Sequence, residues 1–210
     1  MKNIILYAPP AAGKGTQCEF LEKTYGYKVI SIGQVLRNNR SMDTEIGRAI
    51  IETQDKGILT PDNIVFGALK NELEKLGKSN IVIEGFPRNI DQAKLLDELV
   101  DNYIVINLAL DRDVAMKRSL GRLNCNKCGH IHNIYFDNMK PTKDGICNNC
   151  GATLEVRSDD NADSFNKRFD VYEENKDAIL EYYKEKDVLF IVDSNKDKDE
   201  ISSDIAKLIK

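Results

Sequence analysis

Five short apolar runs, rich in branched residues, recur along this chain and are separated by longer stretches with helical spacing. The runs lie at residues 4–7, 29–30, 81–83, 103–108 and 188–192. Continuous apolar runs are typical of strands covered on both faces, and strands that alternate with helices form parallel sheets. The pattern predicts an α/β protein built on a doubly wound, five-stranded parallel sheet. Ligands bind beyond the carboxyl ends of the strands in such sheets, so the residues after each run are the first candidates for a site.

Two segments do not follow this alternation. Residues 31–60 look helical and contain no apolar run of the strand type, which predicts a helical insert. Residues 123–154 contain both histidines, four of the five cysteines and several glycines, and predict a small lobe of loops and strands. The sheet is thus expected to carry two inserted units.

The composition is that of an ordinary globular protein, with 41% apolar and 30% charged residues and a mean hydropathy of -0.42. No apolar stretch approaches the length of a membrane span, and the prolines at positions 9 and 10 come too early for a signal peptide. We therefore expect a cytoplasmic protein with no membrane partner. The net charge of -4 offers no overall attraction to nucleic acid, so any polyanion must be bound locally.

The stretch YAPPAAGKGTQ follows the first apolar run and precedes helical sequence. Its second half matches a phosphate-binding loop at Gly13, Lys14, Gly15 and Thr16, where backbone N–H groups and the lysine would face phosphates. The first glycine of that motif is Ala8 here, and Ala11 falls where a left-handed backbone is expected. Alanine in that conformation costs about 1–2 kcal/mol. The alternative is a plain strand-to-helix turn with an incidental lysine.

Four cysteines form two Cys-x-x-Cys pairs, separated by eighteen residues: Cys125, Cys128, Cys147 and Cys150. This spacing is typical of a zinc ribbon, in which four thiolates fill a tetrahedral shell and leave no open position for catalysis. A redox pair is the other interpretation, disfavoured because two such pairs occur together. His130 and His132 are expected to be surface residues of this lobe, since the cysteines suffice as ligands. The fifth cysteine, Cys18, is expected to be a small buried residue.

Four motifs stand in order along the chain: PPAAGKGTQ, EGFPRNIDQ, RSLGR and RSDD. RSLGR comes just before the paired cysteines, and the arginine of RSDD is followed eleven residues later by a second arginine. Together they resemble adenylate kinases of the type whose lid domain carries zinc. The resemblance implies a monomer that catalyses Mg·ATP + AMP ⇌ 2 ADP. It also implies a core of residues 1–30, 61–121 and 160–210, a monophosphate-binding insert at 31–60, and a lid at 122–159.

The resemblance also assigns roles to individual residues. ATP would be bound by Ala11, Ala12, Gly13, Lys14, Gly15, Thr16, Arg118, Arg122 and Phe136. AMP would be bound by Ile32, Arg37, Gly85, Arg88, Gln92, Arg157 and Arg168. Transfer itself would depend on Lys14, Arg88, Arg122, Arg157 and Arg168, while Asp159 and Asp160 match the lid-hinge acids. Forked guanidiniums and a lysine suit phosphoryl transfer, which asks mainly for positioning and charge neutralisation. Any one of these arginines taken alone is better explained as a surface charge, and the functional interpretation depends on all five standing at the family's spacings.

Arg118 and Arg122 are four apart and are expected to share one face of a helix. Other positions depart from the family. Glu84 and Gln34 stand where the family usually has aspartates that orient water on Mg²⁺, although Glu84 could still serve. Ile32 replaces a small polar residue beside the acceptor base, and Asn89 replaces a threonine. These changes leave two alternatives: a kinase for another monophosphate such as UMP or CMP, and a nucleotide-binding protein with little turnover.

Overall fold

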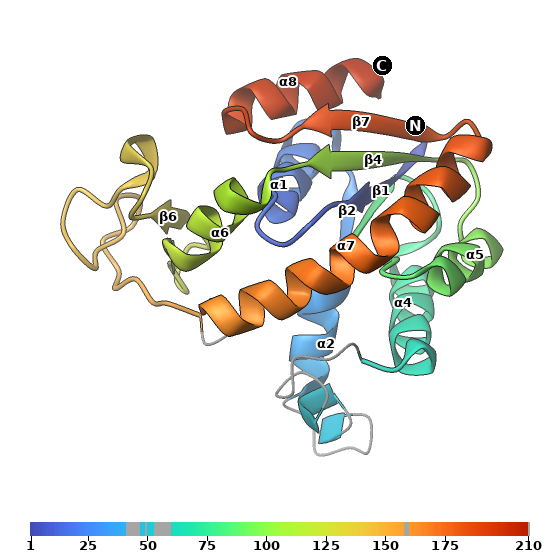
Figure 1. The fold of residues 1–210 in the computed structure, drawn as a ribbon, viewed down its shortest axis with the longest axis horizontal. Coiled ribbons are helices and arrows are strands. Elements are labelled where there is room, and N and C mark those ends of the chain that lie inside the picture. Colours follow the sequence, from blue (N-terminus) through green and yellow to red (C-terminus); the bar gives the residue numbers. More distant parts are fainter. Residues whose placement is uncertain (41–46, 49, 53–59, 158–159, 210) are drawn as a thin grey trace.

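The computed structural model describes residues 1–40, 47–48, 50–52, 60–157 and 160–209. Its main sheet is five-stranded and parallel, in the order β2-β3-β1-β4-β7 (Figure 1). The strands are β1 (Asn3–Tyr7), β2 (Lys28–Ser31), β3 (Ile81–Glu84), β4 (Tyr103–Ala109) and β7 (Leu189–Asp193). All five predicted apolar runs fall on these strands, so the predicted α/β sheet is confirmed.

Alternate residues of the central strand β1 serve two different cores. Ile4 and Leu6 pack in a core with α1 (Lys14–Tyr25) and α8 (Lys198–Leu208). Ile5 and Tyr7 pack in the other core, on the opposite face of the sheet. That core is completed by α4 (Asp62–Leu76), α5 (Ile90–Leu99) and α7 (Ala162–Glu185). Because both faces are covered, the strands must be apolar throughout, which is why the runs were continuous rather than alternating.

The predicted helical insert is described in part. Helix α2 (Ile32–Arg40) follows β2 directly and leaves the carboxyl edge of the sheet. Residues 41–46, 49 and 53–59 lie outside the described part of the chain, so the helical prediction there stays a prediction. Ile50 is fully buried in the core that contains α4, which ties the described piece of the insert to the body of the protein.

The cysteine-bearing lobe follows α6 (Arg112–Leu120) and projects from its end, away from the sheet (Figure 1). It contains β5 (Arg122–Asn124), β6 (Ile131–Asn133) and the short helix η1 (Asp137–Met139). The two strands pair antiparallel. Loops and short strands were predicted here, and both are present. No helix in the described ranges is both long and apolar enough to span a bilayer.

The expectation that Arg118 and Arg122 share a helix face is wrong. Helix α6 ends at Leu120, and Arg122 begins strand β5 instead. Gly121 makes this change of direction possible, because a Cβ at that position would overlap the Asn133 amide and the Tyr135 ring. The side chains of Asn133 and Tyr135 therefore lie so close to the end of α6 that a side chain at position 121 would displace them.

Candidate active site

The loop between β1 and α1 has the backbone that the sequence predicted. Ala11 has a φ of 61° and Gly13 a φ of 85°, so both adopt the left-handed conformation. The strain expected at Ala11 is thus present. Gly13 is the N-cap of α1, and a glycine offers no side-chain acceptor to the N–H groups of the first turn. Those groups and the positive end of the helix dipole are left for an anion.

Lys14 folds back over this loop. Its Nζ donates to the carbonyl oxygens of Ala8 at 3.0 Å and Pro9 at 2.8 Å. Burial lowers the pKa of Lys14 to about 8, with the Arg88 guanidinium adding to the decrease and the Glu84 carboxylate opposing it. Three elements, the loop, the end of β3 and the segment before α5, therefore bring charged groups within electrostatic reach of one another.

Glu84 ends β3 and is opposite Ser31 of β2 in the parallel register. Its Oε1 accepts a hydrogen bond from the Ser31 hydroxyl. The extra methylene relative to aspartate lets the carboxylate reach across to the neighbouring strand. Ser31 was not singled out from the sequence, although its place directly after an apolar run was a usable signal.

Gln34, the other departure from the family, is engaged on its own helix. Its Oε1 accepts from Arg37 at 2.9 Å and its Nε2 donates to Asn38 at 2.8 Å. The carboxamide thus holds the guanidinium that was expected to bind the monophosphate.

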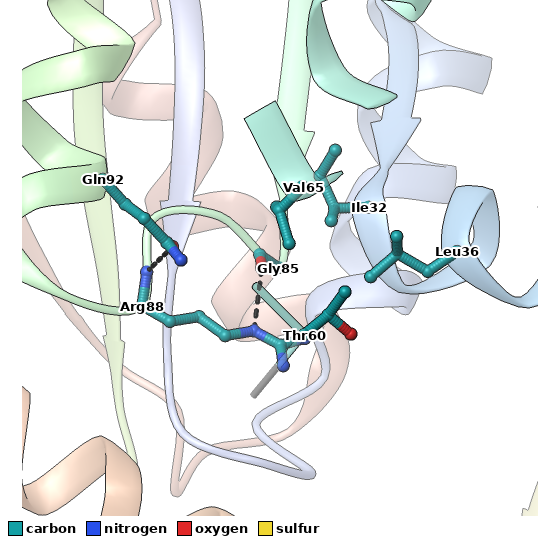
Figure 2. Close-up of a pocket in the computed structure, with 7 residues that line it drawn as sticks. All are labelled: Ile32, Leu36, Thr60, Val65, Gly85, Arg88 and Gln92. Atoms are coloured by element: carbon teal, nitrogen blue, oxygen red, sulfur yellow. Dashed lines mark hydrogen bonds between the residues drawn. The ribbon is translucent and has the colours of Figure 1, made fainter. Parts of the chain in front are cut away.

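A small pocket lies at the carboxyl edge of the sheet, with residues of α2 in one of its walls (Figure 2). Its lining comprises Ile32, Leu36, Thr60, Val65, Gly85, Arg88 and Gln92. The pocket volume is about 10 Å³, which is room for a single water molecule. Four residues expected to bind AMP therefore meet here, and Leu36, Thr60 and Val65 are additions that sequence reasoning missed. A planar base could enter only if these walls moved apart.

Arg88 crosses the mouth of this pocket. Its Nε donates to the carbonyl oxygen of Gly85 at 2.9 Å, as Figure 2 shows. Gly85 has a φ of 82°, and a Cβ there would contact the Gly33 backbone, Ile32 and Arg88. The left-handed glycine thus turns its carbonyl toward the arginine and fixes the direction of the guanidinium.

The arginines at the base of the lobe gather around one acid. Arg122 Nε donates to Asp160 Oδ2 at 2.7 Å, and its terminal nitrogen bonds to Oδ1. Arg168 on α7 lies 3.9 Å from the same Oδ1. Arg157 is half-buried just before residues 158–159, and Asp159 lies outside the described part of the chain. Two of the three expected arginines therefore share a carboxylate.

Arg118 is near the end of α6, beside the lobe. Its guanidinium carbon is 6.0 Å from the centre of the Phe136 ring. One terminal nitrogen also donates to the Lys196 carbonyl oxygen at 3.3 Å. The two residues expected to face the ATP adenine are thus neighbours, one from the core and one from the lobe.

The four paired cysteines converge in the lobe. All four Sγ atoms lie within 4.8 Å of one another, with Cys125 and Cys150 at 3.4 Å and Cys128 and Cys147 at 3.6 Å. Zn–S bonds of about 2.3 Å give sulfur separations of about 3.8 Å in a tetrahedron. The donor set and spacing therefore fit one tetrahedral metal ion.

The two cysteine turns have the same backbone design. Gly129 N–H donates to the Cys125 carbonyl at 2.8 Å, and Gly151 N–H donates to the Cys147 carbonyl at 2.9 Å.

His132 is 1% exposed, so its expected surface position is wrong. Its Nε2 accepts from the Asn148 N–H at 3.4 Å, which ties the second cysteine turn to β6. His130 is exposed, as expected. Cys18 is buried, which confirms that prediction.

Comparison with known proteins gives a consistent result. The family model described as adenylate kinase matches residues 6–188. The adenylate kinase of Methanosarcina mazei is 38% identical over 99% of this chain and 98% of that protein. Those of Caldanaerobacter subterraneus subsp. tengcongensis and Clostridium tetani are 36% and 34% identical, each over 99% of this chain. With its phosphate loop, its converging arginines and this similarity along nearly the whole length, the chain belongs to the adenylate kinase family.

Proposed function

We propose that the chain transfers the terminal phosphoryl group of Mg-bound ATP to AMP and so forms two molecules of ADP. The observation that carries the proposal is that Lys14 of the phosphate loop lies within electrostatic reach of Glu84 and of Arg88, and that Arg88 also lines the small pocket. A donor phosphate chain on the loop and an acceptor in the pocket would meet at these charges. Such positioning and neutralisation is what phosphoryl transfer requires of a protein.

On the donor side, the backbone N–H groups of residues 11–16 and the Lys14 ammonium would bind the phosphates of ATP. Lys14 would exchange its bonds to the Ala8 and Pro9 carbonyls for bonds to phosphate. Arg118 and Phe136 would hold the adenine between them, since a guanidinium and a ring both stack on a base. Arg122, Arg157 and Arg168 would close on the phosphates in transfer.

On the acceptor side, Arg37 and Arg88 would bind the phosphate of AMP. Ile32, Gly85 and Gln92 would contact the base. The pocket of about 10 Å³ must widen to admit it, which is consistent with the position of α2 on one wall and β3 with its following loop on another. Movement of the insert relative to the core would open the site for binding and close it for transfer.

Glu84 is our candidate for holding water on Mg²⁺. One of its oxygens accepts from Ser31, which leaves the other oxygen of the carboxylate available. When bound, Mg²⁺ would neutralise charge on the ATP phosphates. Gln34 does not share this role in our proposal, because both ends of its amide are engaged with Arg37 and Asn38.

We assign the four cysteines to a structural zinc ion. Their thiolates would fill its shell, so the ion would stabilise the lobe and take no part in transfer. We further propose that residues 122–159 act as a lid over ATP, that 31–60 form the monophosphate-binding insert on a core of 1–30, 61–121 and 160–210, and that the protein is a monomer.

The test is ³¹P NMR of the purified protein with Mg·ATP and AMP, UMP or CMP in turn. ADP should form fastest with AMP, and Lys14→Met should abolish transfer while the protein remains folded. Faster turnover with UMP or CMP would reassign the acceptor. Tight ATP binding with no product from any acceptor would instead identify a nucleotide-binding relative without turnover.

A further inference from the structure

The carboxamide of Gln92 is fixed at both ends. Its Oε1 accepts from the backbone N–H of Arg88 at 2.7 Å, and its Nε2 donates to Asp62 Oδ1 at 2.6 Å. A backbone N–H can only donate and an ionised carboxylate can only accept. The two partners therefore permit one orientation of the amide and exclude the orientation rotated by 180°. Gln92 is 2% exposed, so water cannot readily replace either partner.

Asp62 is itself held in place. It lies in the first turn of α4, where the helix dipole favours a negative charge. Asn89 Nδ2 donates to Asp62 Oδ2 at 3.2 Å, while Asn89 Oδ1 caps α5 by accepting the Gln92 backbone N–H at 2.8 Å. The first turns of α4 and α5 are thus linked through these side chains. Asn89 serves both links because an amide offers an acceptor and a donor.

The fixed amide presents a defined edge to the pocket. One N–H on Nε2 and one lone pair on Oε1 are not used by Asp62 or Arg88. The Watson–Crick edge of a 6-aminopurine has an acceptor at N1 and a donor at the 6-amino group, which complements this pair. A 6-oxopurine has the reverse order, with a donor at N1 and an acceptor at O6. An amide free to rotate would read either base.

We propose that Asp62 is a positioning residue that sets base specificity in favour of 6-aminopurine monophosphates over 6-oxopurine monophosphates. It acts through Gln92, by preventing the rotation that would adapt the amide to the wrong base. The inference rests on the proposed function, in which Gln92 contacts the acceptor base. It explains why an acid that touches no base atom would still decide which base is accepted.

The test compares AMP with IMP, whose bases differ at this edge. Asp62→Asn keeps the shape but offers Gln92 a donor or an acceptor. We expect the AMP-to-IMP ratio of kcat/KM to fall about tenfold or more, because a charge-assisted hydrogen bond no longer opposes rotation. KM for AMP should rise and KM for IMP should fall, with kcat at saturating AMP nearly unchanged. Asp62→Ser, which also offers a donor or an acceptor, is expected to behave alike and serves if Asp62→Asn does not fold.

Asp91→Asn is the matched control. Asp91 is an exposed acid in the first turn of α5, so its removal costs a similar helix-dipole interaction but leaves the Gln92 amide clamped. Its AMP-to-IMP ratio should equal that of the unmodified protein. A merely structural role for Asp62 would weaken both acceptors equally, and an unchanged ratio in a folded Asp62 variant would overturn the proposal.

Calorimetric titration with AMP and IMP separates this inference from the function on which it rests. If the unmodified protein produces no ADP, the proposed phosphoryl transfer fails. The ratio of the two dissociation constants still tests the clamp in that case, since it reports base recognition without chemistry. A ratio that collapses in Asp62→Asn supports the clamp, and a ratio that persists contradicts it.

Discussion

Asp160 binds Arg122 through both arms of the guanidinium fork, with Nε donating to Oδ2 at 2.7 Å and a terminal nitrogen bonded to Oδ1. The Asp160 side chain is 0% exposed, and a terminal nitrogen of Arg168 on α7 lies 3.9 Å from its Oδ1. One buried negative charge therefore faces two positive ones. Arg122 and Arg168 are also the side chains proposed to bind the transferred phosphates, so bound ATP would compete with Asp160 for them.

Asp160→Asn should lower the free energy of unfolding by about 3 kcal/mol, because removing one partner leaves a buried charge uncompensated. Chemical denaturation measures this loss. Asp170→Asn is the control, since it breaks an Arg112 pair that is half exposed and should cost less than about 1 kcal/mol. With saturating ATP, the difference in stability from the unmodified protein should become smaller for Asp160→Asn and stay the same for Asp170→Asn. Equal effects of the two substitutions would contradict the buried-charge explanation.

The depressed pKa of Lys14 predicts how ATP binding depends on pH. Burial lowers this pKa from its ordinary value of 10.5 to about 8, so the amine loses its charge as the pH rises past 8. Phosphates beside the amine favour the charged form and raise its pKa again. ATP affinity should therefore fall between pH 7 and 9, and binding near pH 8 should take up a proton.

Titration calorimetry in two buffers with different ionisation heats measures that proton uptake. Lys14→Met should bind ATP without it, and the same uptake in this variant would point to another group. The same lowered pKa of Lys14 also makes the free energy of unfolding depend on pH. Because the pKa is lower in the folded state than in the unfolded chain, Lys14 contributes stability that appears as the pH rises from about 8 toward 10.5.

The lid should depend on its metal for order. Among the described residues, its hydrophobic cluster has only Cys125, Cys147 and Leu154 as buried members, with Leu123, Cys150 and Ala152 packed against them, which is too small to stabilise a lobe of loops. We expect about one zinc per chain by elemental analysis, and a lower melting temperature after chelation. Cys147→Ser should lose the metal, whereas Cys18→Ser should retain it. A metal-free protein with an unchanged melting temperature would refute the structural role.

Gly121→Ala should destabilise the junction between α6 and the lid. The added methyl would overlap Asn133 and Tyr135, and such overpacking costs about 1–3 kcal/mol. The Ile134 N–H, which donates to the Gly121 carbonyl, should exchange faster with deuterium. Gly67→Ala, in open space on α4, should instead stabilise the protein by up to about 1 kcal/mol. Unchanged exchange in Gly121→Ala would contradict this prediction, because it would show that the Asn133 and Tyr135 side chains move aside while the hydrogen bond to Gly121 is kept.

The sequence was informative where a pattern is local. Strands buried on both faces are continuous apolar runs, so all five could be located, and the left-handed Ala11 followed from its place in a motif. The cysteine spacing likewise predicted a cluster because each turn is short. In each case the residues that decide the structure are adjacent in the chain.

Contacts between elements could not be read in this way. Ser31 meets Glu84 through the register of β2 and β3, and Asp62 meets Gln92 because α4 and α5 begin side by side. Arg122 lies in β5, where it pairs with Asn133 of β6, and the side chains that crowd Gly121 come from twelve and fourteen positions further along the chain. These partners depend on packing that no motif states.

Ala11→Gly should relieve the strain in the phosphate loop. An alanine at a φ of 61° costs about 1–2 kcal/mol, while glycine loses about 0.4–1 kcal/mol more conformational entropy on folding, so a net gain in stability of up to about 1.6 kcal/mol is expected. Ala12→Gly is the control, because Ala12 is buried and is not among the described residues with positive φ, and it should be destabilising. Urea denaturation of both variants measures the difference. If Ala11→Gly were less stable than the natural sequence by the full entropy cost of about 0.4–1 kcal/mol, the alanine would carry no strain, and the loop would hold its left-handed turn without cost.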